Sequence, residues 1–223
     1  MREIMPLGDV LVIKPELRRV ANEISDILLK EFPRDDKLTI AIGGESGTGK
    51  SEIAHVIAMN MFKYPYNLKS FILHFDDFFN LPRTERNVHR RKTNFNHVGL
   101  KEIELDDLKH IMINFKKDAG LTLVPIYDIV SNTKHQLIVN FDEIPILIVD
   151  GLYANYLKAD YNIFIDRTYR DTKKFQAERG KEVMDEFRQR VLEAEHNAIK
   201  ALRKNANYII TIDYTLEKVN GRS

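Results

Sequence analysis

The chain of 223 residues has no cysteine, no long apolar run and almost no net charge. Without cysteine, disulfides and thiolate-based zinc sites are excluded, and the composition fits a reducing compartment. No stretch approaches the ~20 apolar residues of a membrane span, and the N-terminus has no apolar signal-peptide core. With 34 basic and 33 acidic residues, the net charge of +1 argues against a protein devoted to nucleic acids or membrane surfaces. We therefore expect a cytoplasmic protein with no nucleic-acid or membrane partner.

Glycine is scarce as well, at ten residues, yet the stretch "GGESGTGKSE" at 43–52 is rich in it. This stretch fits the pattern G-x-x-x-x-G-K-[ST]. In that pattern glycines let the backbone wrap around an anion, and N–H groups at the start of a helix bind phosphate. The run "KLTIAI" (37–42) predicts a buried strand before it, and "SEIAHVIAMNMF" (51–62) predicts a helix after it. The alternative, a glycine-rich turn that happens to precede a lysine, does not explain this setting.

We therefore predict a nucleotide-binding phosphate loop. Lys50 would reach the β- and γ-phosphates, and the Ser51 hydroxyl would ligate Mg²⁺. The predicted nucleotide-binding residues are Gly44, Glu45, Ser46, Gly47, Thr48, Gly49, Lys50, Ser51 and Glu52.

Strand-like and helix-like segments alternate along most of the chain. The predicted strands are 37–42, 70–75, 121–128, 134–141, 144–151, 161–166 and 207–213, and the predicted helices are 15–32, 51–62 and 106–118, the last with an Asp N-cap. We expect 80–97 to form a long loop or short helices, and 168–204 to be helical with a break at Gly180.

This alternation predicts an α/β fold, with a parallel sheet covered by helices on both faces, of the P-loop kinase type. The pair of strands at 121–141 forms a small excursion, and a helical lid follows later. We expect a single domain, 1–223. Its parts would be an N-terminal helical extension (1–36), an acceptor-binding insertion (about 76–141) and a lid (about 167–182).

Three aspartates follow predicted strands, at the edge where α/β sheets bind their ligands. Asp150 ends "ILIVD", which is typical of a Walker-B strand, and would hold Mg²⁺ together with Ser51; the alternative is a cap on a turn. Asp76 and Asp77 follow "ILHF", where one of them could accept a proton from an attacking hydroxyl; the alternative is the N-cap of a short helix. The sequence lacks the N-K-x-D motif of a GTPase and is small for a motor ATPase. The set favours a kinase for a small molecule.

Five segments, taken in order, resemble those of the uridine kinase/phosphoribulokinase family. They are "GGESGTGKSE", "LHFDDFF", "NFNHVG" (94–99), "VPIYDIVSNTK" (124–134) and "ILIVDGLYA" (146–154), and the resemblance runs from about 37 to 213. It implies ATP and Mg²⁺ as cofactors. It makes Asp76, rather than Asp77, the general base, and Lys50 a catalytic phosphate-binding residue. In "AERG" (177–180), Arg179 resembles an arginine of the family's lid.

The same resemblance assigns the acceptor pocket. Phe79, Phe95 and Tyr127 would be its walls. Asn96 stands where the family's nucleoside kinases place a ribose-binding Asp, and Asn132 stands where they place a base-reading His. An amide can still donate and accept hydrogen bonds, but it carries no charge.

The basic stretch "RTERNVHRRK" (83–92) has two interpretations, a solvated surface loop or a site for an anionic acceptor. From the three aromatic residues we predict a nucleoside acceptor such as uridine or cytidine. The alternatives are a phosphorylated sugar or a carboxylate-bearing alcohol and, in a different class, a non-catalytic nucleotide-binding regulator. The expected partner is a small-molecule substrate, and homo-oligomerisation is left open.

Overall fold

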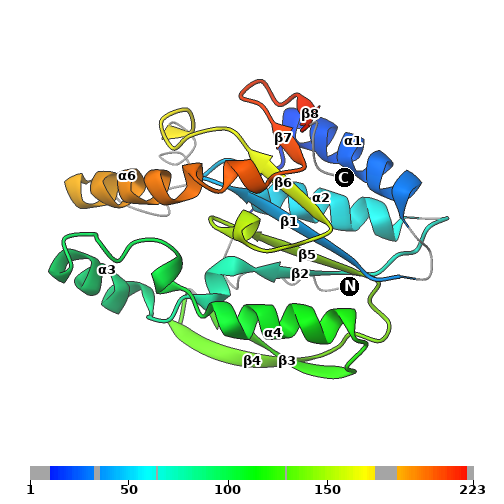
Figure 1. Cartoon of the computed structure of the whole chain (residues 1–223), viewed down its shortest axis with the longest axis horizontal. Coiled ribbons are helices and arrows are strands. Elements are labelled where there is room, and N and C mark those ends of the chain that lie inside the picture. The colour runs from blue at the N-terminus through cyan, green and yellow to red at the C-terminus, as the bar shows by residue number, and fades with distance from the viewer. Residues whose placement is uncertain (1–10, 33–35, 64, 129, 174–184, 220–223) are drawn as a thin grey trace.

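The computed structural model of the chain describes residues 11–32, 36–63, 65–128, 130–173 and 185–219. Helices and strands alternate along these residues (Figure 1). The helices are α1 (Pro15–Glu31), α2 (Lys50–Phe62), α3 (Arg83–Lys92), α4 (Leu105–Lys116) and α6 (Glu186–Lys200), with short 3₁₀ turns η1 (Phe75–Phe78), η2 (Leu100–Glu102), η3 (Ala154–Tyr156) and η4 (Arg203–Asn205). The strands are β1 (Leu38–Gly44), β2 (Ser70–His74), β3 (Leu121–Asp128), β4 (Thr133–Asn140), β5 (Ile146–Gly151), β6 (Tyr161–Ile165), β7 (Tyr208–Ile210) and β8 (Leu216–Lys218).

Six of the described strands form one sheet in the order β2-β5-β1-β6-β7-β8. Neighbours from β2 to β7 pair in parallel, and β8 closes the far edge antiparallel to β7. The carboxyl ends of β1, β2 and β5 therefore meet at one edge, where Ile42 and His74 both pair with Asp150. The predicted parallel α/β fold is confirmed.

Apolar side chains fill both faces of this sheet, as parallel strands require. On one face, Ile40 and Ile42 pack with α1 and α2. On the other, Ala41 belongs to a second cluster that includes η1, α4 and part of α6. Figure 1 shows α1 and α2 on one side of the sheet and α4 on the other. Both faces are thus covered, and the ends of the strands carry the polar groups.

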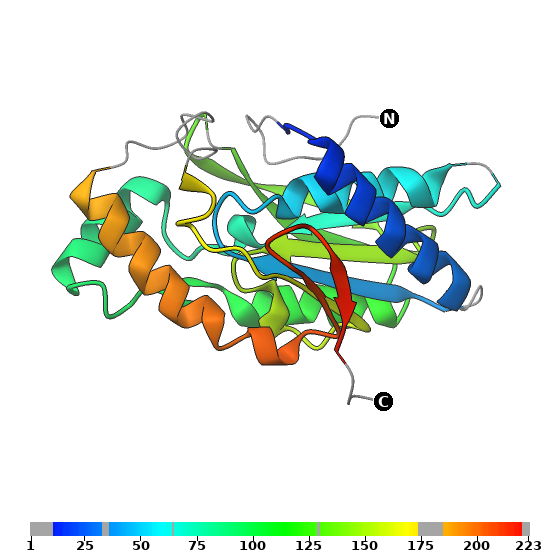
Figure 2. The same ribbon diagram turned by 90° about the horizontal axis from the view of Figure 1, so that it is seen from above.

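A separate two-stranded sheet, the β3–β4 hairpin, lies beside α4 (Figure 1). The chain between β2 and the hairpin carries α3, which lies beside α6 in both ribbon views (Figures 1 and 2). Ring contacts join these two helices, since Phe187 of α6 packs against Phe95 and beneath the guanidinium of Arg91. Segments distant in the sequence thereby surround the carboxyl edge of the main sheet.

Residues 83–92, expected to lie in a long loop or short helices, form the single helix α3. Three other details of the fold differ from the sequence-based prediction. Within the described part of 168–204, residues 168–172 are not helical, and the helix α6 runs from Glu186 to Lys200. Asp185 caps α6 by accepting a hydrogen bond from the N–H of Arg188 (2.7 Å). The N-cap of α4 is Glu104, not an Asp, and strand β8 was not predicted. The break at Gly180 and most of the predicted lid lie outside the described residues.

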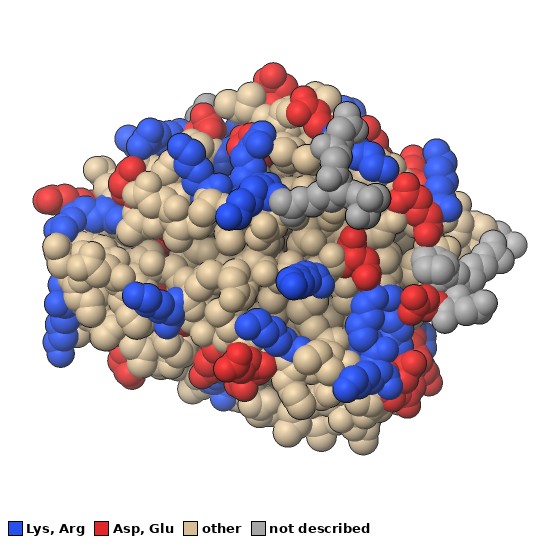
Figure 3. Space-filling view, in the orientation of Figure 1, with Lys and Arg blue, Asp and Glu red and all other residues tan. Residues whose placement is uncertain are grey.

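Basic and acidic side chains are mixed over the face shown in Figure 3, in keeping with the balanced composition. Among the described residues, none of the helices combines the length and the apolar character that crossing a bilayer demands.

Candidate active site

The predicted phosphate loop lies between β1 and α2, with left-handed backbone where its glycines stand. Gly47 and Gly49 have φ of 76° and 97°. A Cβ on Gly49 would also lie 2.5 Å from Cδ2 of Leu17, so α1 packs directly against the loop. Lys50 Nζ donates to the Glu45 carbonyl (2.7 Å), which folds its side chain back over the loop. As at any helix N-terminus, the first backbone N–H groups of α2 can bind an anion.

Contacts from the C-terminal half fix this loop. The Glu45 carboxylate accepts the Tyr169 N–H (2.7 Å), and its other oxygen lies 2.6 Å from His196 Nδ1. Thr48 Oγ1 donates to the Glu45 carbonyl (2.9 Å). Thus Glu45 and Thr48 are buried supports of the loop, whereas Ser46, Gly47, Lys50 and Ser51 line the adjoining cavity. Glu52, on α2, is also buried, and Gly44 packs against Ile165.

Asp150, at the end of β5, is buried beside two polar partners. Its Oδ1 lies 2.6 Å from Nδ1 of His74, the last residue of the neighbouring strand β2. Burial alone would raise the pKa of Asp150, but His74, a hydrogen bond from Ser51 and the charge of Lys50 together hold that pKa below its usual value. A carboxylate ionised at neutral pH therefore touches the Ser51 hydroxyl.

The two adjacent aspartates after β2 face different surroundings. Asp77 is buried, and its Oδ1 accepts the N–H of Tyr127 (2.8 Å). Burial raises its pKa to about 7, against the opposing effects of that hydrogen bond and of His74. Asp76 is exposed toward the cavity. Both aspartates line the cavity, but Asp77 is buried and its carboxylate is hydrogen-bonded to the backbone, whereas Asp76 is exposed.

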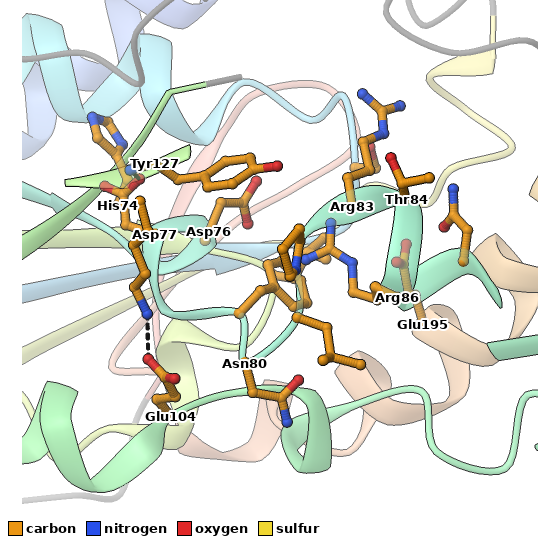
Figure 4. A pocket seen from close by; sticks show the side chains of 18 of the residues that line it. His74, Asp76, Asp77, Asn80, Arg83, Thr84, Arg86, Glu104, Tyr127 and Glu195 are labelled. Carbon is orange, nitrogen blue, oxygen red and sulfur yellow. Dashed lines mark hydrogen bonds and ion pairs between the residues drawn. The ribbon is translucent and has the colours of Figure 1, made fainter. Parts of the chain in front are cut away.

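A cavity of about 610 Å³ opens above these groups. Asp76 and Tyr127 reach it from one side, and Arg83 and Arg86 of α3 reach it from the other (Figure 4). The phosphate-loop and strand-end residues that line it are Ser46, Gly47, Lys50, Ser51, His74, Asp76, Asp77 and Asp150. It is large enough to hold a small ligand beside a nucleotide triphosphate tail.

Three of the five residues predicted for the acceptor line this cavity: Phe79, Tyr127 and Asn132. The Tyr127 hydroxyl donates to Oδ1 of Asn132. Phe95 and Asn96 do not line it. Phe95 instead packs against Phe187 (5.5 Å between centroids) and under Arg190, and Asn96 is exposed. Arg179 lies outside the described residues.

The basic stretch 83–92 divides its side chains between two environments. Arg90 is buried and makes a two-pronged ion pair with Glu102 (2.7 and 2.6 Å), with Glu195 3.3 Å away. Arg91 points elsewhere, over Phe187. The central carbon of the Arg86 guanidinium lies 3.5 Å from the centroid of the Phe79 ring. The stretch is therefore neither a loop nor uniformly solvated.

Sequence reasoning missed His74, Glu195 and Arg188. Arg188 NH2 lies 3.4 Å from Ser46 Oγ of the phosphate loop, and its NH1 lies 3.7 Å from Glu195. Arg188 and Glu195 both belong to α6, which is distant in sequence from the phosphate loop. The sequence of a highly charged helix does not indicate which of its charged side chains face the protein interior. His74 is the last residue of an apolar strand, and that position was the only feature of the sequence that could have indicated a role in the site.

The model of the "Phosphoribulokinase / Uridine kinase family" matches residues 39–212. The uridine kinase of Staphylococcus aureus is 26% identical over 190 residues, which cover 77% of this chain and 86% of that protein. The uridine kinase of Ureaplasma parvum is 27% identical over 134 residues, 58% of this chain, and the match spans 62% of its own length, under two thirds.

Two solved structures share the fold. A possible uridine kinase from Bacillus stearothermophilus superposes with a TM-score of 0.63 at 16% identity, covering 87% of this chain and 98% of that one. Phosphoribulokinase from Rhodobacter spheroides superposes with a TM-score of 0.60 at 15% identity, covering 79% of this chain and 70% of that one. Since the family model spans well over half of the sequence, the chain belongs to the phosphoribulokinase/uridine kinase family.

Proposed function

We propose that this protein transfers the γ-phosphoryl group of ATP to a hydroxyl of a small metabolite. The observation that carries the proposal is the convergence of Lys50, Ser51, Asp150 and Asp76 on one cavity at the carboxyl edge of the sheet. Such an arrangement binds phosphates, a cation and an acceptor within reach of one another. Membership of a family of kinases supports it.

The loop would hold the triphosphate through its backbone N–H groups and Lys50. The Ser51 hydroxyl and the ionised Asp150 carboxylate would hold Mg²⁺ together with the phosphates, because Mg²⁺ prefers oxygen ligands. The hydrogen bond between Ser51 and Asp150 supports this assignment, because it shows that both groups lie close enough to hold one ion. When bound, Mg²⁺ would neutralise charge on the phosphates. We assign Arg188 a supporting role on the same side, because its guanidinium lies beside Ser46.

Asp76 would act as the general base. The acceptor oxygen forms a bond to the γ-phosphorus, the bond from that phosphorus to the ADP oxygen breaks, and the hydroxyl proton passes to Asp76. Asp77 has a pKa closer to that of an ideal base, but its carboxylate is buried and already holds the Tyr127 N–H. Access decides between them, since a base must first reach the proton.

Exchange of each aspartate tests this assignment. Asp76→Asn keeps the shape but removes the base, so kcat should fall at least about 100-fold, within the usual contribution of a general base. ATP binding should persist. Asp77→Asn, the matched control, should keep most of the turnover, because an amide oxygen still accepts the Tyr127 N–H. ADP release and calorimetric ATP binding provide the two readouts. If the Asp77 variant is the inactive one, the base is misassigned; if neither variant differs from wild type, this reaction is not the function.

We propose further that the segment from about 76 to 141 forms the acceptor-binding part of the single domain. Asp76, Phe79, Tyr127 and Asn132 support this, because all line the cavity and all lie within that segment. The non-catalytic regulator is the weaker candidate, since a carboxylate is present where the base is needed.

A further inference from the structure

We propose that the acceptor alcohol carries an oxyanion, a phosphate or a carboxylate, and that Arg86 of α3 binds it opposite Asp76. This inference rests on the proposed phosphoryl transfer and names its substrate class. It departs from the nucleoside expected from the sequence. The side chains that shape the acceptor end of the cavity carry the argument.

The Arg86 guanidinium covers the ring of Phe79, with 3.5 Å between its central carbon and the ring centroid. Stacking of this kind uses the flat face of the guanidinium and leaves its N–H groups pointing outward in the plane. Its Nε is buried and makes no hydrogen bond within the described residues. Arg86 lines the cavity. An oxyanion in the cavity would supply the acceptor that these N–H groups need.

Neighbouring basic groups of the cavity already have partners. Arg90 is neutralised by Glu102 and Glu195. Lys134, on β4, is paired with Glu104. Arg86 has no carboxylate at ion-pair distance among the residues that the structure describes. Burial, followed by the nearby charge of Arg90, lowers the pKa of the Arg86 guanidinium, so a bound oxyanion would stabilise its charged form.

The cavity offers a neutral nucleoside less free aromatic surface and fewer free polar groups than it would need. One face of Phe79 is taken by Arg86, and Phe95, predicted as a second aromatic wall, packs against α6 instead. Asn96 does not line the cavity, and Oδ1 of Asn132 already accepts from the Tyr127 hydroxyl. The aromatic surface and polar groups that would hold a neutral base and ribose are therefore mostly engaged or absent from the described lining.

The experiment compares three acceptors with Mg·ATP: D-glycerate for a carboxylate, ribulose 5-phosphate for a phosphate, and uridine for a neutral nucleoside. ADP release gives kcat and KM. Arg86→Gln removes the charge, and Arg91→Gln is the matched control, an arginine of the same helix that also covers a ring, that of Phe187. Binding of each compound is measured separately by calorimetry with a non-hydrolysable ATP analogue and Mg²⁺.

We expect one of the two anionic compounds to exceed uridine in kcat/KM by at least about tenfold. Its KM should rise about 10- to 100-fold in Arg86→Gln, as for a lost hydrogen bond to a charged group, with a smaller change in kcat. Arg91→Gln should stay within about twofold of wild type. Which anionic compound responds identifies the group as phosphate or carboxylate.

The inference is overturned if uridine is the preferred acceptor and its KM is the same in Arg86→Gln as in the wild type. It is also overturned if neither anionic compound binds in a manner that depends on Arg86. If an anionic compound binds through Arg86 but no acceptor yields ADP, the anion site stands and the proposed phosphoryl transfer fails. Unchanged melting temperatures of both variants would show that the effects are not loss of folding.

Discussion

At the scale of single residues, Asp76 and Asp77 show how adjacent identical side chains receive different tasks. Both lie in the 3₁₀ turn η1 and line the cavity, but Asp76 is exposed there, whereas Asp77 is buried and accepts the N–H of Tyr127. This hydrogen bond links η1, which follows β2, to the β3–β4 hairpin. The sequence could predict that one of two aspartates faces the acceptor, but not that the other ties the hairpin.

The raised pKa of Asp77, about 7, makes the stability of the protein depend on pH. An unfolded Asp titrates near 4, so the folded chain holds this proton more tightly. Between about pH 4 and 7 the unfolded state is ionised while the folded state is protonated, and Asp77 therefore lowers stability as pH rises through this range. In Asp77→Asn this loss disappears.

We expect the free energy of unfolding of Asp77→Asn, relative to wild type, to increase by at least about 1 kcal/mol from pH 5 to pH 8. Urea unfolding of the protein without ligands at both values provides the measurement. Parallel pH profiles of the two proteins would contradict the assignment of a raised pKa to this group.

At the scale of elements, the end of β5 and the start of η1 touch so closely that only glycine fits between them. A Cβ on Gly151 would lie 2.1 Å from Cβ of Phe75, the residue before Asp76. We expect this close approach of Gly151 to Phe75 to fix the position of the proposed base relative to Asp150. The pattern of residues could not reveal it, because a glycine after a strand also fits an ordinary turn.

Gly151→Ala should therefore destabilise the protein by about 1–3 kcal/mol, as overpacking does, and lower kcat by displacing Asp76. Gly120→Ala is the control. There φ is +68°, but a Cβ would meet only the Asp142 carboxylate oxygens at 3.9 Å. It should cost about 1 kcal/mol through backbone strain alone and leave kcat unchanged. Equal kcat values for both variants would show that the β5–η1 contact does not position the base.

Strong periodic patterns explain which elements were predicted. The buried strands β1 and β5 are nearly all apolar, and α1 has an apolar stripe, so local sequence determines them. The basic segment around α3 was ambiguous because its charged side chains point in different directions. Arg90 is buried by ion pairs with Glu102 and Glu195, which lie later in the chain, while Arg86 reaches the cavity. Only the tertiary fold distinguishes them.

At the scale of the whole molecule, a network of charged side chains connects α3, η2, α6 and the phosphate loop, none of which is a strand of the sheet. Arg90 joins α3 to Glu102 of η2 and to Glu195 of α6, and Arg188 continues from Glu195 to Ser46 of the phosphate loop. The network thus spans from the proposed acceptor side to the proposed nucleotide side. Breaking it should affect both stability and the shape of the cavity.

Glu102→Gln removes the charge nearest to Arg90 and should lower the free energy of unfolding by about 3 kcal/mol, as for a buried ion pair that loses one member. Glu143→Gln is the control, because Glu143 pairs with Lys69 at the surface, where both side chains are more than half exposed, and it should have little effect. Chemical denaturation measures both. Similar effects of the two changes would contradict a structural role for the buried network.

The order of strands in the sheet has a consequence for how the protein folds. β1 carries the phosphate loop but is flanked by β5 and β6, which are synthesised only after α4 and the hairpin. Pairing of distant segments is slow, because the loop between them must be closed before the contacts form. The β3–β4 hairpin and the helices are local, and they can form first. A nascent chain therefore acquires its acceptor-side elements before its phosphate loop is supported, and nucleotide affinity should appear only once β6 has left the ribosome.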